Sequence, residues 1–288
     1  MANNAYLVLE NGTVFEGKYF GAQNDVTGEI VFTTGMTGYL ETLTDPSYCG
    51  QIVLQTFPLI GNYGIIPSDF ESANVHASAY IVKHPCSNPS NFRSEGSLDS
   101  FLRERGITGL CGIDTRALTK IIRENGVMNG RIMGSRPVTN NKIIDDIKSF
   151  KINKPVPKVS SIEKKLYKSE TKKFTVALCD FGAKENIKRE LNLRGCDVWM
   201  FPWNSTPDEL LSAAPDGIML SNGPGDPEDN TEVIDNLKSL IKTNVPIFGI
   251  CLGHQLLALA NVYFAIFIRC PIVYTDCAVD IVRRPYAR

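Results

Sequence analysis

A cysteine at position 251 stands between two glycines in the segment Gly249-Ile250-Cys251-Leu252-Gly253. An apolar run precedes this segment and helix-forming residues follow it, so the pattern predicts a sharp turn from a strand into a helix. Such a nucleophile elbow needs small residues two positions before and after the nucleophile, because larger side chains would collide with neighbouring backbone. A helix N-terminus also favours negative charge on the sulfur. The alternative, a buried structural cysteine, explains neither glycine, so we interpret Cys251 as a nucleophile.

The second segment that could do chemistry is SNGPGDP, residues 221–227, which also follows an apolar run directly. Its glycines at 223 and 225 allow backbone N–H groups to point at a ligand oxygen. A plain proline-containing loop and a phosphate-binding loop are the alternatives, but neither the dinucleotide fingerprint nor a Gly-Lys-Ser/Thr loop is present. The segment therefore predicts an oxyanion hole for Cys251, formed by the N–H groups of Gly223 and Leu252.

Strand-like and helix-like segments alternate from residue 174 onward, and these elements must position the two loops. Strands are expected at 174–180, 197–202, 216–220 and 245–250, and helices at 184–194, 206–214 and 231–242. The alternation predicts an α/β fold with a doubly wound parallel sheet and helices on both of its faces. Sites in such sheets lie beyond the carboxyl ends of the strands, which is where both loops are expected.

The first 150 residues have a different pattern and are expected to form a mixed β/α domain, 1–150. The Asn11-Gly12 pair predicts a hairpin within residues 5–21, and further strands are expected at 29–34 and 51–57. A helix is expected at 114–125, with Asp114 as its N-cap and Gly126 as its end.

Residues 151–173 separate the two patterns and contain eight lysines and two prolines. A basic run could bind nucleic acid, but no aromatic interleaving or compact basic motif accompanies it, so a solvated Lys-rich linker is expected. The second domain is then expected to span 174–288.

The overall composition argues against several classes of function. The chain of 288 residues carries 30 basic and 31 acidic residues, and its net charge of −1 indicates neither a polyanionic partner nor an acidic membrane surface. Its eight cysteines form no Cys-x-x-Cys pair, and no signal peptide is visible at the N-terminus. We therefore expect mostly reduced, buried cysteines and a cytoplasmic location.

The two loops together carry a resemblance to a known family. GICLGHQ (249–255) with SNGPGDP resembles the class I glutamine amidotransferases. TTGMTGYLETLTDPSY (33–48), FPLIGNYG (57–64), SNFR (90–93) and GIDTRALT (112–119) resemble the small subunits of carbamoyl-phosphate synthase, so the resemblance spans roughly 5–260. It implies a class I amidotransferase domain, incomplete at its C-terminus, after the N-terminal domain. It also implies that glutamine is hydrolysed through a thioester on Cys251, and that ammonia passes to a large subunit that makes carbamoyl phosphate.

The resemblance also implies roles for individual residues. The nucleophile would be Cys251, and the residues that contact glutamine would be Ser47, Gly223, Gly225, Leu252 and Gln255. Gln255 lies one helical turn after Cys251 and can face the same side, whereas only the resemblance singles out Ser47. The resemblance implies no metal or nucleotide in this subunit, with ATP and Mg²⁺ on the large subunit. Arginine and pyrimidine synthesis are the pathways that it implies.

An acid–base partner for the cysteine is not visible in the sequence. In this family it is a downstream His-x-Glu pair, and histidine is the usual agent for such proton transfers. The three histidines are His76, His84 and His254, and His254 is expected to be structural. The 28 residues 261–288 contain no Gly, Lys, Leu or Glu, which predicts a frameshift or truncation after about residue 260, with a lineage-specific ending as the alternative.

The missing pair predicts impaired glutamine hydrolysis in the chain as written. Two other functions stay open at this point. The chain could be a non-catalytic docking subunit of the same complex, which then uses free ammonia. It could also be a cysteine hydrolase that acts alone on another amide, although this leaves the first domain unexplained.

Overall fold

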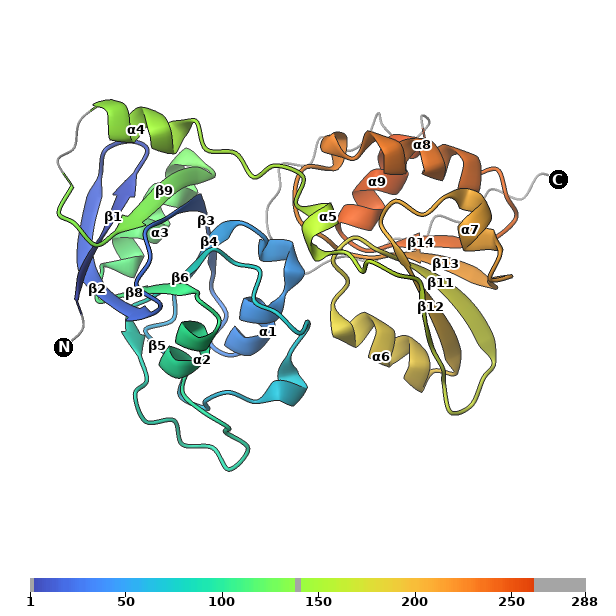
Figure 1. Ribbon diagram of the computed structural model, residues 1–288, viewed down its shortest axis with the longest axis horizontal. Helices are drawn as coiled ribbons and strands as arrows, with labels where there is room; N and C mark the ends of the chain where they lie inside the picture. Colours follow the sequence, from blue (N-terminus) through green and yellow to red (C-terminus); the bar gives the residue numbers. More distant parts are fainter. Residues whose placement is uncertain (1–2, 138–140, 262–288) are drawn as a thin grey trace. The chain divides into compact units, whose positions relative to one another are not determined.

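The computed structural model describes residues 3–137 and 141–261. The described residues form two compact units, which divide between Asn153 and Lys154 (Figure 1). Each unit has its own hydrophobic core. No helix within the described ranges combines the length and the apolar character needed to cross a bilayer.

The first unit is built around a closed β-barrel. Its strands, in order around the barrel, are β1 (Asn4–Leu9), β2 (Val14–Gly21), β8 (Thr108–Cys111), β6 (Ala79–Val82), β4 (Gln51–Gln55), β3 (Val26–Thr33) and β9 (Met128–Met133). The strand pairs β3–β4, β4–β6 and β6–β8 are parallel, and the other pairs are antiparallel. Fully buried side chains such as Leu7, Ile30 and Leu54 fill the core. Closure pairs every barrel strand on both sides, so the barrel presents no open edge.

Three local predictions for this unit are confirmed. In the β1–β2 hairpin, Asn11 Oδ1 accepts the N–H of Thr13 at 3.0 Å, and Gly12 has a φ of +85°, which suits glycine. The strands expected at 29–34 and 51–57 correspond to β3 and β4. The predicted helix is α3 (Thr115–Asn125), which begins where Asp114 Oδ1 accepts the N–H of Ala117 at 3.0 Å.

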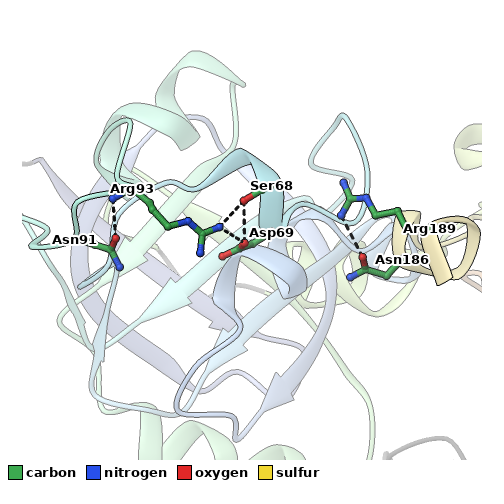
Figure 2. Close-up of polar contacts among 6 residues, drawn as sticks. All are labelled: Ser68, Asp69, Asn91, Arg93, Asn186 and Arg189. Atoms are coloured by element: carbon green, nitrogen blue, oxygen red, sulfur yellow. Dashed lines mark hydrogen bonds and ion pairs between the residues drawn. The ribbon is translucent and has the colours of Figure 1, made fainter. Parts of the chain in front are cut away.

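Shorter elements complete the first unit. They are α1 (Tyr39–Thr44), η1 (Pro46–Tyr48), β5 (Leu59–Ile60), η2 (Pro67–Asp69), β7 (His84–Pro85), α2 (Leu98–Glu104) and α4 (Asn141–Lys148). The SNFR segment lies between β7 and α2, and Figure 2 shows how its arginine is held. The Arg93 guanidinium donates to Ser68 Oγ at 2.6 Å and to Asp69 Oδ1 at 3.0 Å, while the Arg93 N–H donates to Asn91 Oδ1 at 2.8 Å. These contacts fasten the segment to η2.

The second unit contains an open sheet with strand order β10-β12-β11-β13-β14. The strands are β10 (Lys165–Tyr167), β11 (Phe174–Asp180), β12 (Cys196–Pro202), β13 (Gly217–Leu220) and β14 (Ile247–Gly249); all are parallel except β10. The helices are α5 (Val156–Val159), α6 (Glu185–Leu193), α7 (Pro207–Leu211), η3 (Pro227–Asp229), α8 (Thr231–Leu240) and α9 (Leu252–Ala260). In Figure 1, α6 lies on one face of the sheet and α8 and α9 lie on the other, which confirms the predicted α/β sheet.

The segment 151–173 differs from the solvated linker that its lysines predicted. Its Val156, at the start of α5, is fully buried in the core of the second unit. Its residues 165–167 form β10, which pairs antiparallel with β12 at the edge of the sheet. The lysines obscured this role, because Lys164 and Lys165 place their ammonium groups over aromatic rings while their chain segment joins the sheet.

Candidate functional site

The turn around Cys251 joins the end of β14 to the start of α9, as the elbow pattern predicted. Cys251 has φ 50° and ψ −110°, a conformation that L-residues rarely adopt. A Cβ on Gly249 would lie 2.6 Å from the backbone N of His254, and a Cβ on Gly253 would lie 2.5 Å from the carbonyl O of Leu220. Only glycine fits either position without displacing backbone, which is the steric reason given by the sequence pattern.

Backbone hydrogen bonds hold this turn against the neighbouring strand. The N–H of Ile250 donates to the carbonyl O of Leu220 at 2.9 Å, at the end of β13. The N–H of Gly253 donates to the carbonyl O of Ser221 at 3.1 Å. The turn therefore has a defined position relative to the loop that follows β13, and its strained residue is supported on both sides.

Cys251 differs in exposure from the other cysteines that the structure describes. It is exposed, whereas the others are buried or half-buried. Burial, with a smaller contribution from the charge of Asp180, raises the pKa of Cys179 to about 12. Burial also raises the pKa of Cys111. These thiols stay protonated near neutral pH, while Cys251 is accessible at the N-terminus of α9, where negative charge is favoured. Cys270 and Cys277 lie outside the described residues.

The loop 221–227 brings Gly223 next to the Cys251 turn. A Cβ on Gly223 would lie 2.3 Å from the carbonyl O of Phe181 and 2.9 Å from Leu252 Cδ2. Both expected oxyanion donors, the N–H groups of Gly223 and Leu252, thus belong to residues in contact. Gly225 is exposed at φ +89°, and a Cβ there would lie 2.5 Å from Pro155 Cγ. The glycines are needed because two other segments pack closely on this loop.

The other two residues implied for glutamine binding lie in different units. Gln255 is half-buried on α9, and its N–H donates to the carbonyl O of Cys251 at 3.0 Å, one helical turn away. Ser47 belongs to η1 of the first unit, where its N–H donates to Asp45 Oδ1 at 2.9 Å. A contribution of Ser47 to a site on the second unit stays a prediction.

One of the three histidines lies in α9, and the other two lie in the first unit. His254 is half-buried within α9 itself, and His84 is exposed in β7 of the first unit. His76 is half-buried in the first unit, where burial lowers its pKa despite the opposing charge of Asp45. The expected break in the sequence lies within 261–288, of which only residue 261 is described. In the described ranges, no group of three or more His, Cys, Asp or Glu side chains could hold a metal ion.

Three buried polar residues, which the sequence pattern did not single out, fix the loops around the site. They are Asp180, Ser221 and Asn222, whose exposed fractions are 5%, 0% and 4%. Asp180 Oδ1 accepts the N–H of Gly182 at 3.0 Å, and its Oδ2 accepts the N–H of Ser161 at 2.7 Å. One sign of this role was present in the sequence, since Asp180 ends an apolar strand run and Ser221 and Asn222 directly follow another.

Two family models match the chain, one for each unit. The model described as Glutamine amidotransferase class-I matches residues 177–273, and the strand–cysteine–helix turn lies within that match. The second unit is therefore a class I glutamine amidotransferase domain. The model described as Carbamoyl-phosphate synthase small chain, CPSase domain, matches residues 7–132. The amidotransferase match extends to residue 273. It therefore continues beyond residue 260, where the resemblance was expected to end.

Curated relatives narrow the class to one family. The carbamoyl phosphate synthase small chain of Bacillus cereus is 53% identical over 255 residues, which are 88% of this chain and 69% of that protein. Those of Bacillus caldolyticus and Clostridium perfringens are 50% and 51% identical, again over 88% of this chain and over 69% and 72% of theirs. This chain belongs to the carbamoyl phosphate synthase small chain family. An aminopeptidase from Aneurinibacillus sp. strain AM-1 aligns over 90% of this chain and 70% of its own at 14% identity, with a TM-score of 0.29 from which nothing follows.

Proposed function

We propose that this chain is the glutamine-hydrolysing subunit of a carbamoyl-phosphate synthase, with Cys251 as its nucleophile. The observation that carries the proposal is the exposed cysteine in a strained turn between two sterically required glycines, within a class I amidotransferase domain. Family membership supports the same assignment.

In the proposed reaction, Cys251 Sγ attacks the side-chain amide carbonyl of glutamine. A carbon–sulfur bond forms, the carbonyl oxygen becomes an oxyanion, and the N–H groups of Gly223 and Leu252 donate to it. The carbon–nitrogen bond then breaks, and the leaving nitrogen takes up a proton to depart as ammonia. Water finally attacks the thioester and releases glutamate. Gly225, Gln255 and Ser47 would bind the rest of glutamine.

The partner in this proposal is the large chain of the synthase. It would combine the ammonia with bicarbonate in an ATP-dependent reaction, and ATP and Mg²⁺ would bind there. This chain would supply the glutamine site without a metal or a nucleotide of its own. Carbamoyl phosphate produced in this way would serve arginine and pyrimidine synthesis in the cytoplasm.

The hydrolysis step is expected to be slow in the printed polypeptide. In the described part of the second unit the one histidine is His254, which lies within α9 itself, so no second histidine of these residues can protonate the ammonia or activate water. Loss of a triad base costs on the order of 10⁴-fold or more in turnover. We therefore expect covalent modification of Cys251 to be the robust readout, and glutamate release to be weak.

The test uses a diazoketone analogue of glutamine, which alkylates a nucleophile that sits at the side-chain carbonyl. The L-analogue is expected to modify Cys251, excess L-glutamine is expected to protect it, and the D-analogue serves as a control. Cys251→Ala should remove the adduct, and peptide mapping separates Cys251 from Cys270 and Cys277. Modification without stereoselectivity or without protection by glutamine would contradict the proposal.

One observation favours a second candidate, a docking subunit without glutaminase activity: the described part of the second unit holds a single histidine, His254, within α9. The two candidates separate when the chain is mixed with the large chain of a related synthase. Carbamoyl phosphate synthesis from ammonia but not from glutamine, together with an unreactive Cys251, would favour the docking role.

A further inference from the structure

Three loops meet at the carboxyl ends of β11, β13 and β14, and the side chain of Ser221 joins two of them. Ser221 Oγ accepts the N–H of Phe181 at 2.9 Å and lies 2.7 Å from the carbonyl O of Asn222. Because the Phe181 N–H can only donate, the hydroxyl keeps its own proton for the Asn222 carbonyl. The Ser221 side chain is fully buried, so both bonds are shielded from water.

The side chain of Asn222, the next residue, also forms hydrogen bonds that hold this loop in place. Asn222 Oδ1 accepts the N–H of Lys184 at 3.1 Å, and Asn222 Nδ2 donates to the carbonyl O of Gly182 at 3.0 Å. Both partners lie in the segment that follows β11. Asn222 therefore fixes where the loop lies, while Ser221 fixes one particular peptide group within it.

The peptide group that Ser221 holds is the one that carries the Gly223 N–H. A trans peptide is planar, and its C=O and N–H point in opposite directions. Holding the Asn222 carbonyl therefore sets the direction of the Gly223 N–H. Glycine at 223 offers no side chain to resist rotation of this peptide, so a dedicated hydrogen bond is needed. The carbonyl of Ser221 also accepts the N–H of Gly253, which links the same residue to the Cys251 turn.

We propose that Ser221 is a positioning residue for thioester formation: its buried hydroxyl locks the Asn222–Gly223 peptide so that the Gly223 N–H is aimed at the oxyanion. This inference rests on the proposed function of Cys251. Ser221 touches no substrate in this account and acts only through the peptide that it holds. Loss of its hydroxyl should therefore slow reactions that develop an oxyanion and spare those that do not.

Two reagents, applied to the 288-residue polypeptide, distinguish a reaction that develops an oxyanion from one that does not. The γ-aryl thioester of L-glutamate acylates Cys251: the new carbon–sulfur bond forms, the old one breaks, and the aryl thiolate leaves with its electron pair, so no proton donor is needed. Iodoacetamide alkylates the same sulfur at a tetrahedral carbon and forms no oxyanion. The ratio of the two rate constants at Cys251 reports the oxyanion contribution alone.

Ser221→Ala is expected to lower this ratio by about tenfold or more, because loss of an oxyanion donor typically costs about 10²–10³ in rate. Ser221→Thr keeps the hydroxyl and is expected to hold the ratio within about threefold of the parent value. The matched control is Asn192→Ala. The Asn192 amide donates to the carbonyl O atoms of Tyr167 and Cys196, at the amino end of β12 and away from the site.

The outcomes distinguish this inference from the proposed function. Failure of the thioester to acylate Cys251 in the parent chain would overturn the proposed function itself. Acylation of the parent with an unchanged ratio in Ser221→Ala would overturn only the positioning role. An equal fall in Ser221→Thr or in Asn192→Ala would also overturn it. If Ser221→Ala does not fold, Ser221→Thr still decides, because a fall of tenfold there contradicts the role of the hydroxyl.

Discussion

The barrel of the first unit and the open sheet of the second both contain glycines at which an added Cβ would lie within 3 Å of a neighbouring atom. In the barrel, a Cβ on Gly17 would lie 2.4 Å from the carbonyl O of Cys111, and one on Gly130 would lie 2.5 Å from Ile30 Cδ1. In the second unit, a Cβ on Gly249 or Gly253 would lie within 3 Å of backbone atoms, and these two glycines flank an exposed thiol.

The comparison teaches that steric confinement of glycine does not by itself mark a functional site. In the barrel, confined glycines allow strands and core side chains to approach, and the sheet closes on itself. In the second unit, the open sheet ends in loops at the carboxyl side of its strands, and the glycines bring those loops together around Cys251. A position with room only for glycine allows close packing in the barrel, whereas in the second unit it shapes the turn that presents Cys251.

The largest expected effect separates Cys251 from the buried thiols. Near pH 7.5 iodoacetamide should react with Cys251 more than about a hundredfold faster than with Cys179, because a thiol with pKa about 12 is almost entirely protonated there. Mass mapping of partially alkylated protein measures both rates. Comparable rates at Cys251 and Cys179 in folded protein would contradict the expected difference between the exposed thiol and a buried thiol of the same unit.

Alanine at the confined glycines tests the comparison directly. Gly253→Ala and Gly130→Ala should each lower the free energy of unfolding by about 1–3 kcal/mol, because added atoms displace neighbours in packed regions. Only Gly253→Ala should also slow the alkylation of Cys251. Gly96→Ala is the matched control, since a Cβ there meets nothing within 4 Å, and its effect should stay within about 0.5 kcal/mol. Slower alkylation in Gly130→Ala would contradict the division of roles.

The pH dependence of stability should show a contribution from the first unit. Burial lowers the pKa of His76 from 6.5, so the unfolded chain binds a proton first as the pH falls. His76 therefore lowers stability as the pH falls from 6.5 to its folded pKa, and imposes no penalty above 6.5. His76→Gln should reduce the loss of stability between pH 7.5 and 5.5 in denaturant titrations. A steeper acid loss in His76→Gln would contradict this sign.

A smaller effect is expected for the contacts of Arg93 in Figure 2. The Arg93 side chain is 48% exposed in its ion pair with Asp69, so Arg93→Ala should cost no more than about 1 kcal/mol. The loss should shrink at high salt, because the pair is screened. Thermal melts at two ionic strengths measure it. A cost of several kcal/mol would mean that this segment is part of the barrel core.

The Asn186–Arg189 contact provides a comparison in the second unit. Arg189 donates to Asn186 Oδ1 at 3.1 Å along the surface of α6, as Figure 2 also shows. Because this pair is exposed and lies within one helix, Arg189→Ala should change stability by only a few tenths of a kcal/mol, about 0.2–0.5.

Much of the second unit was predictable because its pattern is local. Alternating apolar and helical runs specified β11 to β14 and α6 to α8, and the glycine spacing around Cys251 specified the turn. The sequence pattern predicted that side chains at 249 and 253 would collide with neighbouring backbone, and the structure has backbone atoms within 3 Å of a Cβ at either position. In contrast, the closed barrel was not predicted, since its strand order joins segments far apart in the sequence, such as β2 with β8.

The remaining part of the candidate site depended on pairings that no short window contains. Ser221 and Asn222 act through Phe181, Gly182 and Lys184, about forty residues earlier in the chain, so their types alone suggested only a loop. The lysine-rich segment likewise hid β10, because an edge strand can carry charge. The role of Ser47 still depends on resemblance alone.

The central claim is that Cys251 forms a thioester with the side-chain carbonyl of glutamine. The most direct measurement incubates the polypeptide with glutamine labelled with ¹³C at that carbonyl, stops the reaction with acid, and determines the mass of the peptide that contains Cys251. The account predicts a glutamyl adduct on Cys251 that carries the label and disappears in Cys251→Ala. An unmodified Cys251, in protein whose Cys251 still reacts with iodoacetamide, would contradict it.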